Sequence, residues 1–257
     1  MDIQGIFEKQ LAEDYSCSVT DVRSKEHIFT KKEYRPGRRI FRGDECLLKV
    51  VCVNGKLIVS TEEEILDWCR DAWKDASAAW FFDVENLRKL DEKLKTLGHK
   101  VGDCHHYYLP TGAEFMKETV DKGIEGVTLK WYEAEEIEWF RHNNSYPEAL
   151  SFIAESPDVL AVAAWKNDVI LGMAGASSDS DTMWQIGINV TKDGEGMGMG
   201  TFLVTNLKRE ILKRGIVPFY GTAESHIKSQ KVGIQSGFLP AWAELYSAEI
   251  SMPSHYN

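Results

Sequence analysis

The stretch INVTKDGEGMGMGTFL, residues 188–203, decides how the C-terminal half of the chain is interpreted. It joins an apolar strand end to a loop in which every second residue from Gly194 to Gly200 is glycine, and then to the apolar start of a helix. Backbone N–H groups in such a loop converge on an anion, and the helix N-terminus adds a favourable dipole. The segment therefore predicts a loop that cradles a polyphosphate.

Two common phosphate motifs do not fit this loop. A dinucleotide fingerprint needs G-x-G-x-x-G, but the third glycine position falls on Thr201 when counted from Gly196 and on Met199 when counted from Gly194. A nucleotide-triphosphate P-loop needs Gly-Lys followed by Ser or Thr, and no lysine lies among these glycines. The glycine spacing therefore excludes the dinucleotide fingerprint, and the missing lysine excludes the P-loop.

The elements around the loop predict an α+β domain over 126–257, with a mixed, mostly antiparallel sheet flanked by helices. Successive strands joined by tight turns, the first at Asn167-Asp168, indicate an antiparallel meander. The expected order is strand GVTLKWYE, helices EAEEIEWFRHN and YPEALSFIAES, strands VLAVAAWK, VILGMAGAS and TMWQIGINV, then helix TFLVTNLKREILKRG, strand VPFYGTA, helix HIKSQKVGIQS and a strand around AELYSAEIS.

The first 125 residues predict a smaller α/β domain. Asn54-Gly55 favours a two-residue turn, so residues 45–60 are expected to form a hairpin. A helix is expected to begin at a Thr61 cap with Glu64 three residues on, and a second to cover 84–97. The polar stretch 111–125 is expected to separate the two domains, 1–125 and 126–257.

The composition of the chain limits the classes of partner that it is expected to bind. The 257 residues carry a net charge of -10, which argues against binding nucleic acid or an anionic membrane surface and favours a small molecule. Five widely spaced cysteines and the lack of a signal-like or membrane-spanning apolar run predict a cytoplasmic chain without disulfides. Cys104-His105-His106 is not expected to bind metal, because adjacent strand residues face opposite sides.

The loop and a second motif resemble the GNAT superfamily of acyl-CoA-dependent N-acetyltransferases. The family pattern runs from a strand-ending Val through Arg/Gln-x-x-Gly-x-Gly/Ala, and Val190, Gly198 and Gly200 match it. Farther on, His226-Ile227-Lys228-Ser229 and Ser236-Gly237-Phe238 are similar to the family's Asn-x-x-Ser and Gly-Phe elements. The likeness covers about 126–257, and SGFLPAWAELYS also resembles the zwittermicin self-resistance subgroup.

The resemblance implies that an acetyl group moves from acetyl-CoA to a primary amine of a small molecule by direct attack on the thioester. A backbone N–H near the strand end would polarise the acyl carbonyl, and main-chain groups of Ile188 and Val190 would pair with the pantetheine arm. The residues expected to bind the coenzyme are Ile188, Asn189, Val190, Glu195, Gly196, Met197, Gly198, Met199, Gly200, Thr201, His226 and Ser229.

Three positions depart from the family pattern. Glu195 stands in the Arg/Gln place, where Lys192, Lys228 or Lys231 would have to offset its charge. His226 replaces Asn, and Gly233 stands where many members have a Tyr as general acid.

Glu224 is the candidate general base, and Tyr246 is the candidate acid. Their alternatives are a helix-start carboxylate and a tyrosine packed in the sheet. Ser229 either binds the coenzyme or is an ordinary helix-surface serine.

Two other function classes stay open. A degenerate domain would make the chain a noncatalytic acyl-CoA-binding regulatory protein, and an interaction module would bind no coenzyme at all. The first 125 residues either shape the acceptor pocket or form the contact of a homodimer.

Overall fold

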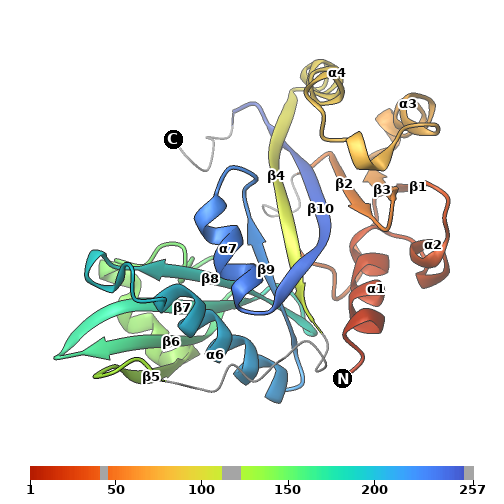
Figure 1. Cartoon of the computed structure of the whole chain (residues 1–257). Helices are drawn as coiled ribbons and strands as arrows, with labels where there is room; N and C mark the ends of the chain where they lie inside the picture. Colours follow the sequence, from red (N-terminus) through yellow and green to blue (C-terminus); the bar gives the residue numbers. More distant parts are fainter. Residues whose placement is uncertain (41–45, 112–122, 252–257) are drawn as a thin grey trace. The chain divides into compact units, whose positions relative to one another are not determined.

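The computed structural model describes residues 1–40, 46–111 and 123–251 (Figure 1). The chain divides into two compact units. Unit 1 consists of residues 1–3 and 108–240, and unit 2 of residues 4–107 and 241–257. Each unit is described by itself.

The sheet of unit 1 has the order β9-β8-β7-β6-β5. Strands β6, β7 and β8 form the predicted antiparallel meander, and β5 pairs antiparallel with β6. Asn167 and Asp168 turn the chain between β6 and β7 with φ angles of 48° and 61°. Strand β9 pairs in parallel with β8 after a helical crossover. The strands are β5 (Thr128–Glu133), β6 (Asp158–Lys166), β7 (Val169–Ser178), β8 (Met183–Val190) and β9 (Val217–Thr222).

Helices lie on both faces of this sheet (Figure 1). An apolar cluster packs against each face. Helix α6 (Met199–Lys213) packs on one face through Leu203, Leu207 and Ile211, and α7 (Ile227–Gln235) adds Val232. The other face is covered by α5 (Ala134–Ile137), the 3₁₀ helix η3 (Glu138–Asn143) and the segment that follows it. The α+β fold predicted for this part of the chain is confirmed.

The helix predicted over YPEALSFIAES is wrong, because these residues form a turn and an irregular segment. Side chains, rather than carbonyl groups one helical turn back, accept several of its N–H groups. Asn144 Oδ1 accepts from the N–H of Tyr146 at 2.8 Å, and Asp158 Oδ2 accepts from that of Phe152 at 2.7 Å. Such local hydrogen bonds compete with helix formation.

Unit 2 combines helices with the strand order β1-β3-β2-β10-β4. The predicted hairpin is confirmed: β2 and β3 are antiparallel, with Asn54 and Gly55 at φ 50° and 79°. The elements are α1 (Ile3–Asp14), α2 (Val19–Arg23), β1 (Ile28–Lys31), β2 (Leu48–Val53), β3 (Lys56–Thr61), α3 (Glu63–Trp73), the 3₁₀ helix η2 (Ala78–Trp80), α4 (Val84–Lys95), β4 (His99–Pro110) and β10 (Phe238–Glu249).

The expected Thr61 cap is wrong. Thr61 ends β3, and its hydroxyl donates to Leu47 O at 3.0 Å instead of accepting from the helix. Helix α3 begins after Glu62, which makes no side-chain cap bond. Because β3 pairs with β2 as far as Thr61, this threonine belongs to the sheet and does not cap the helix.

The compact units do not coincide with the segments 1–125 and 126–257. Residues Ala243–Tyr246 of β10 pair with Lys49–Cys52 of β2, which brings the end of the chain into unit 2. The separating stretch 111–125 falls largely outside the described residues. That residues 1–125 and 126–257 fold as separate domains remains a prediction.

In the part of the chain that the structure describes, no helix has both the length and the apolar character needed to cross a membrane. The cysteines are free thiols, and burial raises the pKa of Cys52 and Cys69 to about 12. Among the same described residues, no group of three His, Cys, Asp or Glu side chains could hold a metal ion.

Candidate functional site

The candidate site begins where β8 and β9 part. The two strands pair only from Met183–Ile186 to Val217–Tyr220, although β8 continues to Val190 and β9 to Thr222. β9 is the neighbour of β8 on this side of the sheet, so Gly187–Val190 leave their outward backbone groups without a strand partner among the described elements. An extended ligand can hydrogen-bond to such an edge.

Two of these backbone groups belong to the residues expected to pair with the pantetheine arm. Thr191 donates its N–H to Leu171 O on β7 at 2.9 Å. Because successive N–H groups of a strand point to opposite edges, those of Val190 and Ile188 point to the side of β9. The structure thus aims both groups into the space where the strands part.

The glycine loop leads directly from β8 into α6. It contains the 3₁₀ helix η4 (Lys192–Gly194), and Gly196 and Gly198 have φ angles of 76° and 73°, a region that favours glycine. A Cβ on Gly194 would lie 2.2 Å from Leu171 O. Three of the four glycines are therefore required by the backbone path or by packing.

The start of α6 supplies hydrogen-bond donors to the same place. Gly198 is the N-cap residue, and the first helical bond runs from Phe202 N to Gly198 O at 3.0 Å. The N–H groups of Met199, Gly200 and Thr201 have no acceptor within the helix and lie at its positive end. Met199 is buried beneath the loop and Met197 is partly buried.

The charges around the loop are exposed. Glu195 projects into solvent, so water screens the repulsion that it would exert on a phosphate. The lysines Lys192, Lys228 and Lys231 are also exposed. A phosphate in this loop would therefore be held by backbone N–H groups more than by a fixed cation.

The start of α7 shows what Ser229 touches. Its Oγ lies 2.8 Å from the hydroxyl of Tyr220, the last residue of β9 that pairs with β8. A Cβ on Gly233 would lie 3.0 Å from the Tyr220 ring. Tyr220 thus fills the space beside Gly233 and occupies one side of Ser229. His226 is the exposed N-cap residue of α7 and makes no side-chain cap bond.

Sequence reasoning missed Tyr220. Its side chain is buried, and burial is the main reason that its pKa is raised above the ordinary value of 10.0. Gly233 is the residue that could have indicated a bulky neighbour such as Tyr220, because a glycine inside a helix and away from its ends indicates close packing.

The two candidate catalytic residues fall in different compact units. Glu224 lies in unit 1, in the exposed bend between β9 and α7, where its backbone oxygen accepts from Gln230 Nε2 at 2.7 Å. Tyr246 lies in unit 2 on β10, and its buried hydroxyl donates to Asp103 Oδ2 at 2.7 Å. Their catalytic roles remain predictions.

Asn189 has a structural use that the sequence did not reveal. Its side-chain oxygen accepts hydrogen bonds from the N–H groups of Glu148 and Ala149, both at 2.8 Å. The side-chain oxygen of Asn189 therefore holds the segment 144–152 on the sheet. Gly175 and Gly187, each inside a strand, were the signal for a close backbone approach.

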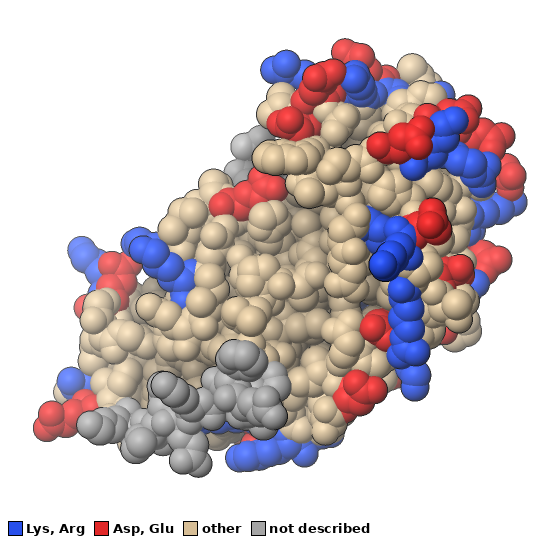
Figure 2. Space-filling model, turned by 45° about the vertical axis from the view of Figure 1, so that its right-hand side comes forward, with Lys and Arg blue, Asp and Glu red and all other residues tan. Residues whose placement is uncertain are grey.

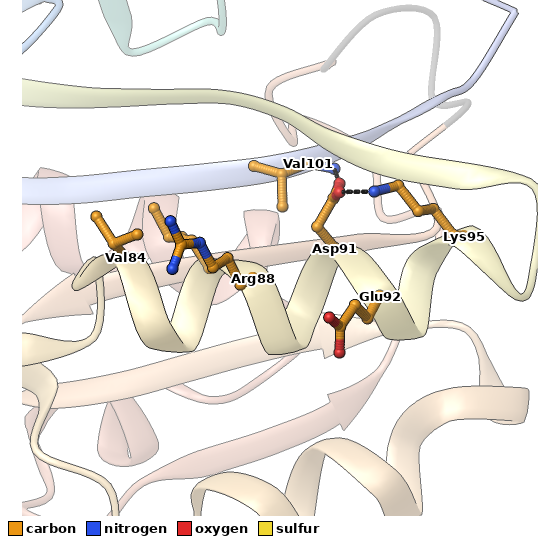
Figure 3. Close-up of a pocket in the computed structure, with 7 residues that line it drawn as sticks. Val84, Arg88, Asp91, Glu92, Lys95 and Val101 are labelled. Atoms are coloured by element: carbon orange, nitrogen blue, oxygen red, sulfur yellow. Dashed lines mark hydrogen bonds and ion pairs between the residues drawn. The ribbon is translucent and has the colours of Figure 1, made fainter.

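A hollow of about 320 Å³ lies in unit 2 beside α4 (Figure 3). Three aliphatic and four charged residues line it. The Asp91 carboxylate is held by Lys95 Nζ at 2.6 Å and by the N–H of Val101 at 2.9 Å. Asp91 and Lys95 form an ordinary i,i+4 helix pair, and none of the lining residues was predicted to be functional. It is lined by Val84, Leu87, Arg88, Asp91, Glu92, Lys95 and Val101.

Comparison with known families agrees with the geometry of unit 1. Residues 128–238 match the Acetyltransferase (GNAT) family. The match covers less than half of the chain. The match spans the parting strands, the glycine loop and α7, and it ends at Phe238 of the Gly-Phe pair. The finer likeness to the zwittermicin-resistance subgroup remains a prediction.

Solved structures with a similar fold are distant in sequence. A GCN5-related N-acetyltransferase-like protein from Streptococcus suis is 12% identical with a TM-score of 0.49, and the match covers 93% of this chain and 98% of that one. A GCN5-related N-acetyltransferase from Kribbella flavida is 12% identical with a TM-score of 0.45, at 84% and 91% coverage.

A protein described as a GNAT-family acetyltransferase from Novosphingobium aromaticivorans is 12% identical, with a TM-score of 0.39. That match covers 58% of this chain and 66% of the other, just under two thirds of its length. No curated protein matches the sequence significantly.

The residues present fit the donor that this family uses, acetyl-CoA. Glycines whose added Cβ would be strained or would clash, together with the start of α6, suit a pyrophosphate. The edge Gly187–Val190 suits the amide groups of a pantetheine arm. These are the residues that would hold the donor.

Proposed function

We propose that this protein transfers an acetyl group from acetyl-CoA to a primary amine of a small molecule. One observation carries the proposal: β8 and β9 part after Ile186 and Tyr220, directly before the loop Gly194–Gly200. A thioester whose pyrophosphate lies in the loop and whose pantetheine pairs with β8 has its acyl end directed toward the point of parting.

The chain's own groups would supply orientation and polarisation. The N–H groups of Ile188 and Val190 point to the side where β9 has left the sheet, where one of them can donate to the acyl oxygen. Such a donor stabilises the negative charge that develops when an amine attacks the carbonyl carbon. The C–N bond forms, the C–S bond breaks, and the amine loses a proton to a base.

The acceptor class follows from charge. The chain has a net charge of -10, and on the face shown in Figure 2 acidic and basic side chains are interspersed rather than gathered by sign. A small cationic amine is compatible with this surface, whereas nucleic acids and anionic membranes need a basic patch. We place the protein in the cytoplasm, and a homodimer is compatible with the proposal.

Two measurements test the proposal. CoA at one hundred times its Kd should stabilise the folded chain by about 2.7 kcal/mol, which a thermal shift detects. Thiol release from acetyl-CoA should then rise when an amine is added from a panel of a polyamine, an aminoglycoside, an amino-acid ester and a short peptide.

Stabilisation by CoA without thiol release for any amine would leave the chain a noncatalytic acyl-CoA-binding protein. The absence of a thermal shift would exclude both readings.

A further inference from the structure

The segment 144–152 crosses the sheet of unit 1 at a pair of glycines. Gly175 on β7 and Gly187 on β8 lie opposite each other in the strand register. A Cβ on Gly187 would lie 1.8 Å from Glu148 O, and one on Gly175 would lie 1.9 Å from Ala149 O. The backbone of residues 148 and 149 therefore lies directly on the strands, where no side chain fits.

Hydrogen bonds to Asn189, two residues after Gly187 on β8, hold Glu148 and Ala149 in place. Asn189 Oδ1 accepts from the N–H groups of both Glu148 and Ala149. On either side, Asn144 Nδ2 donates to Leu150 O at 2.8 Å, and Asp158 accepts from the N–H of Phe152. The backbone of Glu148 is thus held in place although it belongs to no helix or strand.

This fixed point lies at the opening between β8 and β9. Gly187 directly follows Ile186, the last residue of β8 that pairs with β9. Ile186 and Ile188 pack into the cluster beneath α6, so the alternation of a strand turns Gly187 and Asn189 to the opposite face. Glu148 therefore reaches the opening from the face opposite α6.

The side chain of Glu148 is exposed, and its negative charge influences the pKa of Tyr220. Burial chiefly raises the pKa of Tyr220, and the negative charge of Glu148 adds to that increase. Tyr220 is the last residue of β9 to pair with β8, so Glu148 lies within electrostatic range of the residue at which the strands part.

From this placement we infer that Glu148 is the carboxylate that binds the acceptor amine and takes its proton. The inference rests on the proposed function and deepens it. The bound ammonium first gives one proton to the Glu148 carboxylate, which passes it to solvent and leaves a free amine. The nitrogen then forms its bond to the acyl carbon while the C–S bond breaks. The second N–H proton leaves through the same carboxylate to solvent, and the departing thiolate is protonated by water. The carboxylate also selects acceptors that carry a positive charge.

A matched set of variants tests the inference on the full-length chain. Glu148→Gln removes the charge and the basic oxygen without altering backbone contacts, and Glu155→Gln removes an exposed charge from the same connection. With the best amine of the panel named above, we expect Glu148→Gln to lower kcat by about 100-fold or more, the usual effect of losing a general base.

Further measurements separate this effect from a structural one. Glu148→Gln should also lose the acidic limb of the pH–rate profile, which reports the base. Its urea midpoint and its Kd for CoA should equal those of the wild type, and Glu155→Gln should match the wild type in every respect. Glu148→Asp should recover part of the activity.

The outcomes of these experiments distinguish the role of Glu148 from the proposed acetyl transfer itself. If the wild type turns over and Glu148→Gln keeps kcat within threefold, this inference is wrong while the proposed function stands. A loss confined to Glu224→Gln would assign the base to Glu224 instead. If the wild type binds CoA but releases no thiol with any amine, both the function and the role of Glu148 fall.

Discussion

At the scale of single residues, the glycines of unit 1 have two different uses. In the loop Gly194–Gly200, Gly196 and Gly198 have positive φ angles that let the backbone turn toward α6. In the sheet, Gly175 and Gly187 have ordinary strand conformations but leave room for another backbone. The first kind was read from the sequence as a ligand loop, whereas the second kind needed the structure.

The sheet glycines lead to a stability prediction. Gly187→Ala places a methyl group 1.8 Å from Glu148 O, so the segment 144–152 has to move. Overpacking of this kind usually costs about 1–3 kcal/mol of unfolding free energy, measurable by urea denaturation. The control is Gly123→Ala, where, apart from its chain neighbours, none of the described residues comes within 4 Å of the added methyl. Equal stability of the two variants would contradict the packing described for Gly187.

At the scale of elements, α7 is joined to α6 by a buried lysine. Lys208 of α6 is 2% exposed, donates to Ser236 O at the C-terminal end of α7, and lies 5.5 Å from the centre of the Phe238 ring. A cation at this helix end satisfies a carbonyl and faces the negative pole of the dipole. Even so, burial lowers the pKa of Lys208 to about 8.

The lowered pKa predicts how stability changes with pH. Between pH 8 and about 10.4, the unfolded chain binds a proton at Lys208 that the folded chain has released, so stability rises with pH. The rise should approach about 3 kcal/mol by pH 10.5, because each pKa unit corresponds to about 1.4 kcal/mol.

Urea denaturation from pH 7 to 10.5 measures this rise. The exposed Lys213→Met variant serves as the control and should keep the rise, whereas Lys208→Met should lose it. A rise of equal size in Lys208→Met would assign it to other groups.

At the scale of the whole molecule, buried charges join both ends of the chain within unit 2. Arg39 contacts Asp14 Oδ2 at 2.6 Å through Nε and Glu244 Oε1 at 2.9 Å through Nη2. Tyr15 also donates to Glu244 Oε1, at 2.7 Å. Since Asp14 ends α1 and Glu244 lies on β10, the last strand is bound to the first helix.

This network predicts a large effect of one substitution. Arg39→Met leaves the carboxylates of Asp14 and Glu244 buried without their cation, which should cost about 3–5 kcal/mol in urea denaturation. Arg70→Met breaks an exposed pair with Asp67 and should cost less than about 1 kcal/mol. Similar losses in both variants would show that the buried network adds nothing specific to stability.

The sequence predicted the elements whose signals are local. The hairpin at Asn54-Gly55, the turn at Asn167-Asp168, the meander and the long helix after the glycine loop all follow from turn residues and periodicity over a few positions. The segment 146–156 was wrongly predicted as a helix because the side chains that compete for its N–H groups include Asp158 and the distant Asn189.

The sequence by itself determined the strand–loop–helix order around the glycine loop and the resemblance to the acetyltransferase family that residues 128–238 match, because glycine spacing and element order are properties of neighbouring residues. Only the tertiary structure decided where β8 parts from β9, that Tyr220 lies beside Gly233, and that Glu148 is held on a pair of glycines. Each of these depends on contacts between residues far apart in the chain, and such contacts leave no periodic signal.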